Sequence, residues 1–312
     1  GFVSPHPRRA ILPLSAGLDS MYSLFRHTDP ARPLGSVTAD LEAALFIDGV
    51  TALASGPASS AALQEKVREC AALRDLPVVV VRTNWEDHVD PFYSHGALLA
   101  ACITVLSSHF GLGLVGASPP HALLEYPVYG SAPCVDVFYG SAGMEIRSDG
   151  ADLIRDQKAA ALTAYAEALE HISVCTTRGR SARNCGRCEK CIRTMVNFIA
   201  TGCEIPRAFP MGIDLSRVGK RFRTYMTLKF AAYTIWHGKE MGVRHPAMRR
   251  LRRKYIARSI DYALRSAITR CLPWIDLMER DLDYPRWLVL RRARRRLDAA
   301  RAQQPRVRAG AG

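Results

Sequence analysis

The sequence predicts an α/β fold in which helices cover both faces of a parallel sheet, and three observations support this. First, short apolar runs of the kind found in buried strands recur along the first half of the chain. Second, stretches with helical spacing of apolar residues separate these runs, which is typical of parallel sheets. Third, small or polar residues follow the runs, at the edge where such sheets bind ligands. The four expected strands span residues 10–14, 41–50, 77–81 and 113–117.

Each element follows from its local sequence. Ala43-Ala44-Leu45-Phe46-Ile47 forms the apolar centre of the second strand, which ends at the turn Asp48-Gly49. Ser59-Ser60 can cap a helix that leads to the third strand. Pro77 and the valines after it define that third strand, because β-branched residues favour extended backbone. We expect the helices over residues 19–27, 59–73 and 94–110.

Residues 119–150 are rich in Pro, Gly, Ser and Tyr, and we expect them to be irregular. Irregular segments of this length inside a compact domain are often functional, so we interpret this one as a substrate lid. The alternative is a segment that simply packs over the edge of the sheet. Asp136 within it is a candidate metal ligand or orienting group, with an Asx-turn as the alternative role.

A further helix is expected from Asp152 to Ile172. It carries Arg155 and Lys158 three positions apart and therefore on one face. Both side chains are candidates for contact with a phosphate or a substrate carboxylate, and a solvated helical face is the alternative.

Positive charge is concentrated in the last third of the chain. From residue 205 onward there are 26 Lys and Arg against 8 Asp and Glu, a net charge of +18, whereas the part before it has 17 against 21, or −4. Such a region attracts polyanions such as nucleic acid or anionic lipid, and a solvated helical surface is the alternative. We expect several basic helices from about residue 215. The prolines that divide them are Pro246, Pro273 and Pro285.

The expected organisation is a catalytic domain over residues 1–205, a basic helical region over 206–302 and a disordered tail over 303–312. No stretch of about 18 uncharged apolar residues is present, and the N-terminus lacks a signal-peptide pattern. We therefore expect no membrane span and a cytoplasmic location. The first residue is Gly1, which fits a processed form or a fragment.

The segment Ser15-Ala16-Gly17-Leu18-Asp19-Ser20 follows the first strand and opens the first helix. Backbone N–H groups and the helix dipole favour an anion there, so the segment predicts a phosphate loop and makes ATP the leading ligand. Its hydroxyls add donors, and Asp19 offers a carboxylate for phosphate-bound Mg²⁺. An ordinary helix cap and turn is the alternative. Asp48, Gly49 and Ser118 end other strands, so we expect them in the same crevice.

Four of the nine cysteines, Cys175, Cys185, Cys188 and Cys191, lie close together in the sequence. Four thiolates with two-residue spacings suit a tetrahedral Zn²⁺. Because four protein ligands leave no open position, this zinc is expected to be structural. The alternatives are an iron–sulfur cluster and reduced cysteines without a ligand.

The loop Ser15–Ser20 resembles the Ser-Gly-Gly-x-Asp-Ser loop of the PP-loop ATP pyrophosphatases, adenine nucleotide alpha hydrolase-like proteins of Rossmann-like fold. Ala16 stands where that family has its first glycine, and a methyl group would obstruct a backbone that needs positive φ. With Asn184-Cys185-Gly186-Arg187-Cys188-Glu189-Lys190-Cys191-Ile192-Arg193, the chain is similar to the 7-cyano-7-deazaguanine synthases and their relatives. The resemblance covers residues 8–205, and the basic region after it has no counterpart in the compact synthases.

The resemblance implies that a small carboxylate attacks the α-phosphate of ATP, giving an acyl-adenylate and pyrophosphate, and that ammonia or an amine then forms an amide. It also implies ATP, Mg²⁺ and Zn²⁺ as cofactors. The candidate nucleotide-binding residues are Ser15, Ala16, Gly17, Leu18, Asp19, Ser20, Asp48, Gly49 and Ser118. The candidate catalytic residues are Asp19, Ser20, Arg155 and Lys158.

Two other functions are open alternatives. PP-loop proteins also adenylate bases of tRNA, and the basic region would suit RNA. Its Trp236, Trp274 and Trp287 can stack on bases, although core packing is the other role open to them. A nucleotide-binding module without catalysis is the second alternative, because Ala16 departs from the family pattern.

Overall fold

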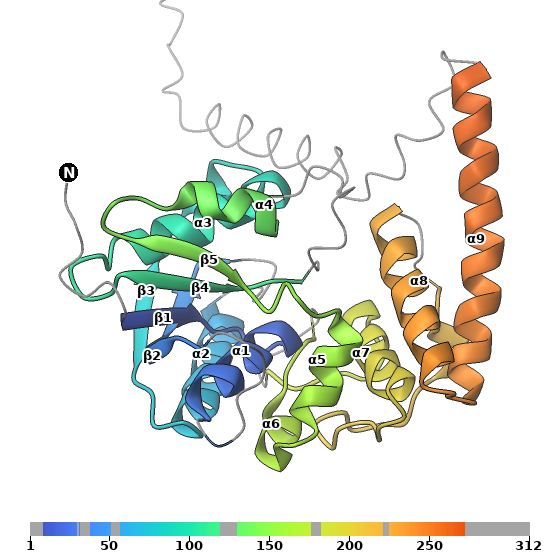
Figure 1. Ribbon diagram of the computed structural model, residues 1–312, viewed down its shortest axis with the longest axis horizontal. Helices are drawn as coiled ribbons and strands as arrows, with labels where there is room; N and C mark the ends of the chain where they lie inside the picture. The colour runs from blue at the N-terminus through green and yellow to red at the C-terminus, as the bar shows by residue number, and fades with distance from the viewer. Residues whose placement is uncertain are drawn as a thin grey trace, which may run out of the picture.

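The computed structural model describes residues 9–29, 31, 38–50, 57–118, 130–175, 182–220 and 225–271. Its centre is a five-stranded, Rossmann-like parallel sheet with the strand order β3-β2-β1-β4-β5 (Figure 1). The strands are β1 (Arg9–Pro13), β2 (Asp40–Asp48), β3 (Val78–Arg82), β4 (Leu112–Gly116) and β5 (Glu145–Asp149). The first four coincide with the apolar runs of the sequence, so the predicted α/β class is confirmed.

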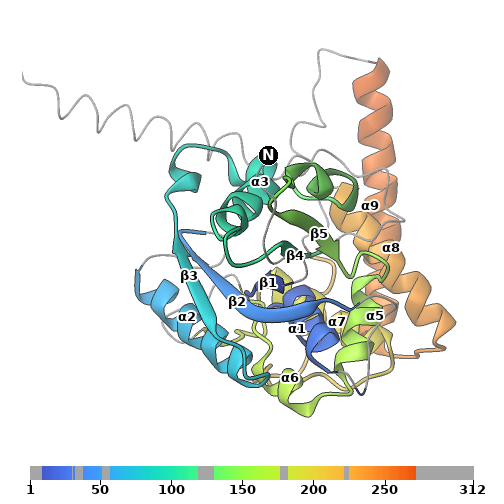
Figure 2. The ribbon, with the colours of Figure 1, turned by 60° about the vertical axis from the view of Figure 1, so that its left-hand side comes forward.

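Helices cover both faces of the sheet, as predicted. α1 and α2 lie on one face with α5, α6 and α7, whereas α3 lies on the other with the short α4 (Figures 1 and 2). The helices are α1 (Leu18–Thr28), α2 (Pro57–Ala72), α3 (Pro91–Thr104), α4 (Pro133–Asp136), α5 (Arg155–Leu162), α6 (Ala166–His171), α7 (Glu189–Ala200), α8 (Tyr225–Glu240) and α9 (Pro246–Cys271). Short 3-10 helices are η1 (Trp85–Asp87), η2 (Val137–Tyr139) and η3 (Leu215–Arg217).

Each face of the sheet has its own hydrophobic core. On one side, Leu12 of β1 belongs to a core with Phe25 of α1 and Phe198 of α7. On the other side, its neighbour Ile11 belongs to a core with Leu98 of α3. Successive residues of a strand point to opposite faces, and here both are buried because helices cover both.

The fifth strand corrects the sequence analysis, which expected residues 119–150 to be irregular. β5 pairs in parallel with β4 along the sheet edge, and α4 and η2 precede it. Its sequence Glu-Ile-Arg-Ser-Asp is mostly polar, because an edge strand needs few buried side chains. The search for apolar runs therefore missed it. Residues 119–129 lie outside the described residues, and the lid interpretation stays a prediction.

The single helix expected over residues 152–172 is in fact two helices, α5 and α6, separated at Thr163–Tyr165. Tyr165 has extended backbone angles and is buried, with its ring centroid 4.7 Å from that of Phe25. This aromatic contact with the core favours a break that local helix propensity does not indicate.

The basic region forms helices, as expected for its described part. Pro246 begins α9, whereas Pro273, Pro285 and the tail 303–312 lie outside the described residues. α8 packs against α7 and α9, and Leu251 of α9 shares a core with α1. The domain boundary at residue 205 stays a prediction.

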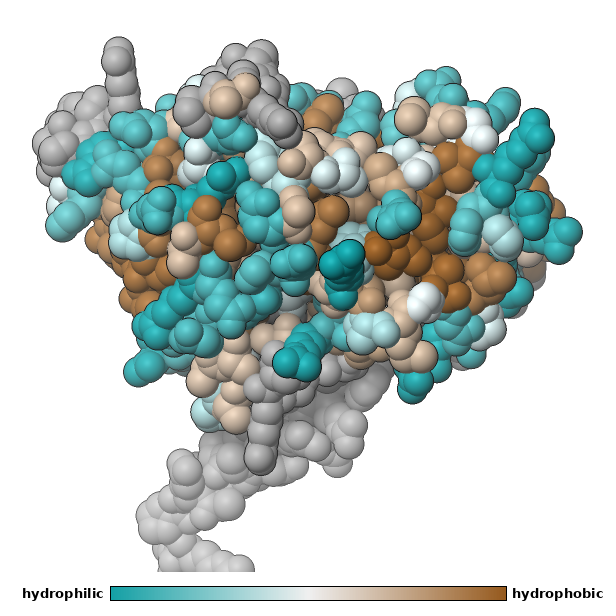
Figure 3. Space-filling view, turned by 90° about the horizontal axis from the view of Figure 1, so that it is seen from below, coloured by the Kyte–Doolittle hydropathy of each residue, from teal (hydrophilic) through white to brown (hydrophobic). Residues whose placement is uncertain are grey.

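The basic region can contact the expected RNA or other polyanion only through residues that are exposed on its surface. Trp236 is 51% exposed, and Trp274 and Trp287 lie outside the described residues. Figure 3 shows hydrophilic residues around smaller hydrophobic areas on the face seen from below. In the part of the chain that the structure describes, no helix has both the length and the apolar character needed to cross a membrane.

Candidate functional site

The strand order creates a topological switch point between β1 and β4, because the chain continues from these two neighbours toward opposite sides of the sheet. Parallel sheets of this kind bind ligands beyond the carboxyl ends of the strands at such a point. Ser15–Ser20 follow β1 and Ser118 follows β4. The structure thus brings these predicted residues to one place.

The Ser15–Ser20 loop turns the chain from β1 into α1. The hydroxyls of Ser15 and Ser20 lie 3.2 Å apart, and the Ser20 hydroxyl donates to the Gly17 carbonyl over 3.2 Å. The Leu18 side chain is buried in the core, so only its backbone can meet a ligand. Gly17 is the N-cap residue, and no side chain caps α1. Its first N–H groups are therefore left to a ligand or to water, as an anion site at a helix start requires.

Ala16 has a backbone φ of +57°, in the left-handed region that favours glycine. Its methyl group is fully buried, and its carbonyl accepts a hydrogen bond of 2.7 Å from the Ser173 N–H. Residue 16 therefore has the positive backbone φ at which a glycine would be favoured. A non-glycine residue in this conformation costs about 1–2 kcal/mol.

The Asp19 carboxylate lies in a buried charged cluster, which we define as Asp19, Arg155, Lys158 and Ser118. Arg155 Nη1 and Ser118 Oγ both donate to Asp19 Oδ2, the latter over 2.9 Å. Lys158 Nζ lies 3.5 Å from Asp19 Oδ1 and donates to the Ala117 carbonyl. Lys158 is fully buried, and the Asp19 side chain is only 12% exposed. Residues that are far apart in the sequence thus meet beside the loop.

The cluster has a net positive charge next to a loop suited to an anion. Burial would raise the pKa of Asp19, but the Arg155 and Lys158 cations and the Ser118 hydrogen bond outweigh it and hold that pKa below its ordinary value. Burial lowers the pKa of Lys158 despite the nearby carboxylate. Both Asp19 oxygens face cationic or hydroxyl groups, so this arrangement does not support the predicted role of Asp19 as a Mg²⁺ ligand.

Asp48 and Gly49 lie at the end of β2, one strand away from the switch point. Asp48 accepts hydrogen bonds from Ser60 Oγ over 2.5 Å and from Arg82 Nε over 3.0 Å, and the Ser60 bond is the main cause of its lowered pKa. Gly49 has a φ of +112°, and a Cβ there would lie 1.9 Å from the Thr83 carbonyl oxygen. These contacts join β2 to α2 and β3, and a nucleotide-binding role for Asp48 and Gly49 stays a prediction.

Asp136 has a structural role. It is 1% exposed and accepts hydrogen bonds from the Ser131 hydroxyl over 3.0 Å, from the Ala132 N–H over 3.1 Å and from the Ser148 hydroxyl. Burial raises its pKa. The carboxylate therefore joins α4 to β5, which agrees with the alternative turn role more than with binding a metal or orienting a nucleophile.

The four sulfurs predicted to bind zinc lie within 4.8 Å of one another, from Cys175, Cys185, Cys188 and Cys191. The Cys175 and Cys188 sulfurs are 3.8 Å apart, and those of Cys185 and Cys191 are 3.9 Å apart. Four sulfurs at about 2.3 Å from a tetrahedral Zn²⁺ would be about 3.8 Å apart. The residues present therefore fit a structural zinc ion.

The local backbone supports this arrangement of sulfurs. Gly186 has a φ of +66°, which turns the chain so that the Cys188 N–H points to the Cys185 sulfur over 3.2 Å. The Cys191 N–H points to the Cys188 sulfur over 3.5 Å, and Cys188 is the N-cap of α7. Buried Asn184 bonds to the backbone of two neighbouring segments, at Ile172 and Val174 after α6 and at Ala208. A bound ion would therefore fix the start of α7.

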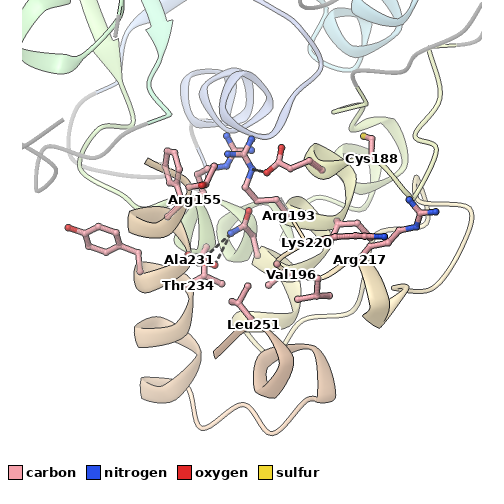
Figure 4. A pocket seen from close by; sticks show the side chains of 18 of the residues that line it. Arg155, Cys188, Arg193, Val196, Arg217, Lys220, Ala231, Thr234 and Leu251 are labelled. Atoms are coloured by element: carbon pink, nitrogen blue, oxygen red, sulfur yellow. Dashed lines mark hydrogen bonds and ion pairs between the residues drawn. The ribbon is translucent and has the colours of Figure 1, made fainter. Parts of the chain in front are cut away.

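A cavity of about 420 Å³ lies between α5, the cysteine loop, η3, α7 and α8 (Figure 4). Neither the cavity nor the buried set Asp156, Asn197 and Thr234 in its wall was predicted from the sequence. Arg155 also lines it and so belongs both to the cavity and to the charged cluster. The sequence signal that could have been followed is Asn197, a polar residue inside the apolar run 195–199.

The comparisons with known proteins gave no match. No protein-family model, no curated protein and no solved structure matches this chain. The resemblance to the PP-loop proteins therefore rests on the Ser15–Ser20 loop and the cysteine motif, and membership of that family is a proposal.

We expect Ala16→Gly to cost less stability than the same change at another buried alanine. The glycine relieves left-handed strain, which offsets the lost methyl burial and the higher chain entropy of glycine. Ala10→Gly in β1 is the control, since Ala10 is equally buried but has no positive φ. Urea unfolding should separate the two variants by about 1–2 kcal/mol. Equal losses would contradict a strained backbone at Ala16.

We expect Asp19→Asn to lower the free energy of unfolding by about 3–5 kcal/mol, because it leaves buried cations unpaired. The pKa of Asp19 is lower in the folded than in the unfolded state, so the ionised carboxylate stabilises the fold. This contribution is fully present above the unfolded pKa of about 4 and is lost as the pH falls through the folded pKa. The wild type should therefore lose stability on acidification more steeply than the variant. Urea unfolding from about pH 7 to about pH 3 measures both effects.

The control for this prediction is Asp261→Asn, which removes ion pairs on the surface of α9. It should change stability by less than about 1 kcal/mol. If Asp19→Asn were as mild as this control, the charged cluster would not have the stabilising role that we assign to it.

Purified protein should contain one Zn²⁺ per chain, and Cys191→Ser should lose it together with thermal stability, because metal binding adds to the folding free energy. Elemental analysis and thermal unfolding measure the two effects. Cys134→Ser is the control, since this exposed cysteine lies outside the cluster. Iron with visible absorption would indicate the iron–sulfur alternative, and protein purified under reducing conditions without metal would contradict the zinc site.

Proposed function

We propose that the protein is an AMP-forming enzyme of the PP-loop type, which adenylates a small carboxylate with ATP and then transfers the acyl group to ammonia or an amine. The observation that carries this proposal is the convergence of Ser15–Ser20, Ser118, Arg155 and Lys158 at the switch point of a parallel sheet. These residues were selected on sequence grounds from separate parts of the chain. Their meeting beside an uncapped helix start supports a triphosphate site there.

In the proposed reaction, the first amides of α1 and the hydroxyls of Ser15 and Ser20 hold the phosphates. An oxygen of the acceptor carboxylate attacks the α-phosphorus, and the bond from that phosphorus to the bridging oxygen breaks, so pyrophosphate leaves with the electron pair. Arg155 and Lys158 supply positive charge where the leaving group becomes more negative. Asp19 keeps these two cations in position. Mg²⁺ would add further charge neutralisation on the phosphates.

The second step needs only the amine and the mixed anhydride. Ammonia or an amine attacks the acyl carbon, the bond to the AMP oxygen breaks, and the nitrogen loses a proton. The cysteine loop takes no part in this chemistry, because four thiolates fill the coordination sphere of a zinc ion. In this proposal the cysteine loop holds α7 in place. Arg193 of α7 lies close enough to Asp19 to contribute to the lowering of its pKa.

Adenylation of an RNA base is a second candidate, because the structure leaves Trp236 half exposed and α9 displays Arg252, Arg253 and Lys254 to solvent. An exposed aromatic ring on α8 and exposed cations on α9, which packs against it, are groups that suit a nucleic acid. RNA affinity that falls steeply with salt, and that is lost in a variant with these three basic residues changed to Gln, would favour this candidate.

The test of the main proposal is the product formed from ATP when small carboxylic acids and ammonium are supplied. We expect AMP and pyrophosphate with a suitable acid, and a loss of about 100-fold or more in Arg155→Gln, since it removes a charge-assisted contact to the leaving group. Arg68→Gln, on the exposed face of α2, is the matched control and should keep full activity.

Other products distinguish the alternatives. ADP with phosphate would overturn the proposal, because it shows cleavage at the outer phosphate. Calorimetry with ATP shows whether the nucleotide binds at all. ATP binding without turnover across the panel of acids would indicate a nucleotide-binding module without catalysis.

A further inference from the structure

The second half of α9 is an amphipathic helix whose apolar side is exposed. Large aliphatic side chains follow one another there at intervals of four residues: Ile256, Ile260, Leu264 and Ile268. Their exposed fractions range from 40% to 59%. At about 100° per residue, these positions form one continuous stripe along the helix. The same sector contains smaller apolar residues that are also exposed, namely Ala257, Ala263, Ala267 and Cys271. We call these residues together the α9 stripe.

The α9 stripe points away from the body of the protein. At the start of α9, the side chains of Ala247, Met248 and Leu251 are buried in the core that contains α7. At about 100° per residue, these three side chains lie on the side of α9 opposite to the stripe. Figures 1 and 2 show the second half of α9 extending beyond α8. A helix of a globular protein normally turns its apolar side to the core, so the orientation of this one favours an external apolar partner.

Cationic side chains lie on the same side of α9, directly before the stripe. Arg249 and Arg253 are exposed, and at about 100° per residue they fall in the sector of the stripe. The single acidic residue of α9 is Asp261. Its carboxylate lies 3.5 Å from Arg258 Nη1 and 3.2 Å from Arg265 Nε. α9 itself therefore has no carboxylate left to neutralise Arg249 and Arg253, and its outward side combines aliphatic surface with positive charge.

Three kinds of partner differ in what they offer to this surface. A second copy of the chain would bring more positive charge, since the region from residue 205 onward has a net charge of +18. A nucleic acid offers phosphates to the cations, but its bases stack on aromatic rings, and the α9 stripe contains none. A leaflet of anionic phospholipid offers head-group charges to the cations and acyl chains to the aliphatic side chains. The combination of charge and apolar surface therefore favours the anionic leaflet.

We propose that α9 is a membrane-binding helix that lies in the interface plane of an anionic phospholipid leaflet. The α9 stripe contacts the acyl chains, and Arg249 and Arg253 contact the head groups. The stripe from Ile256 to Ile268 extends about 18 Å along the helix axis, parallel to the leaflet. Because the stripe is opposite to the core side of α9, the leaflet contacts the helix without displacing α7 or α8. This inference goes beyond the proposed function and does not depend on it.

The experiment measures cosedimentation of the full chain with vesicles that contain equal parts of phosphatidylglycerol and phosphatidylcholine. Vesicles of phosphatidylcholine alone are the reference without net charge. We expect binding to the anionic vesicles, and binding about tenfold or more weaker to the reference vesicles. At about 0.5 M salt the Debye length falls to about 4 Å, so binding that persists at this salt concentration reports the apolar contact.

A first pair of variants tests the apolar contact. Ile260→Gln with Leu264→Gln keeps every charge and should weaken binding to anionic vesicles about tenfold or more, because the acyl chains lose two aliphatic partners. Binding at high salt should disappear. The matched control is Val105→Gln with Val137→Gln, which changes two exposed valines outside α9 and should bind as the wild type does. Circular dichroism verifies that each variant is folded.

A second pair of variants tests the charge. Arg249→Gln with Arg253→Gln should weaken binding to anionic vesicles about tenfold or more, because each cation near such a surface contributes about fivefold. The matched control is Arg258→Gln with Arg265→Gln, which removes the same charge from the other side of α9. It should weaken binding less than the first change does. Equal losses would show a response to net charge alone and would overturn the assignment to this side of the helix.

The other partners give different results, each of which overturns the proposal. A dimer in analytical ultracentrifugation that dissociates in the Ile260→Gln, Leu264→Gln variant would assign the stripe to a second copy. Vesicle binding that this variant leaves unchanged, together with tighter binding to single-stranded RNA, would assign the surface to nucleic acid. Absence of binding to anionic vesicles at low salt would also contradict it. None of these measurements uses ATP, so the membrane proposal and the proposed adenylation can fail separately.

Discussion

The ion cluster around Asp19 is the constraint on which the rest of the site depends. Buried charges are tolerated only when they are paired, and here one carboxylate holds a guanidinium, an ammonium and a hydroxyl from α5 and the end of β4. This pairing fixes where α1 begins relative to α5. Since the loop Ser15–Ser20 leads into α1, the same contacts set the position of the N–H groups that could meet a phosphate.

A second anchor lies at the cysteine loop. Its sulfurs are spaced for a tetrahedral ion, and its last cysteines open α7. α7 packs between α5 and α8, so the helix that the cysteines open also carries Arg193 and Asn197 of the cavity wall. The two anchors hold opposite sides of the cavity, and Arg155 belongs to the side that also contacts Asp19.

Ala16 is an alanine in a backbone conformation that favours glycine. The backbone keeps the left-handed conformation although the residue is alanine, and the Ser173 N–H holds its carbonyl in place. The methyl group points into the core rather than toward solvent, as its complete burial shows. The alanine therefore costs stability in this conformation, and its methyl group takes up space in the core.

The sequence by itself determined the α/β class, four strands and the grouping of the cysteines, because apolar runs and short spacings are local signals. It also selected Asp19, Ser118, Arg155 and Lys158 and placed the first two in one crevice, but it did not predict that Arg155 and Lys158 join them. It assigned Asp19 to Mg²⁺, whereas the structure pairs it with cations. Tertiary structure alone decided the polar edge strand β5, the break before Tyr165 and the cavity. Each of these arises from contacts between segments far apart in the chain, for which no local pattern exists.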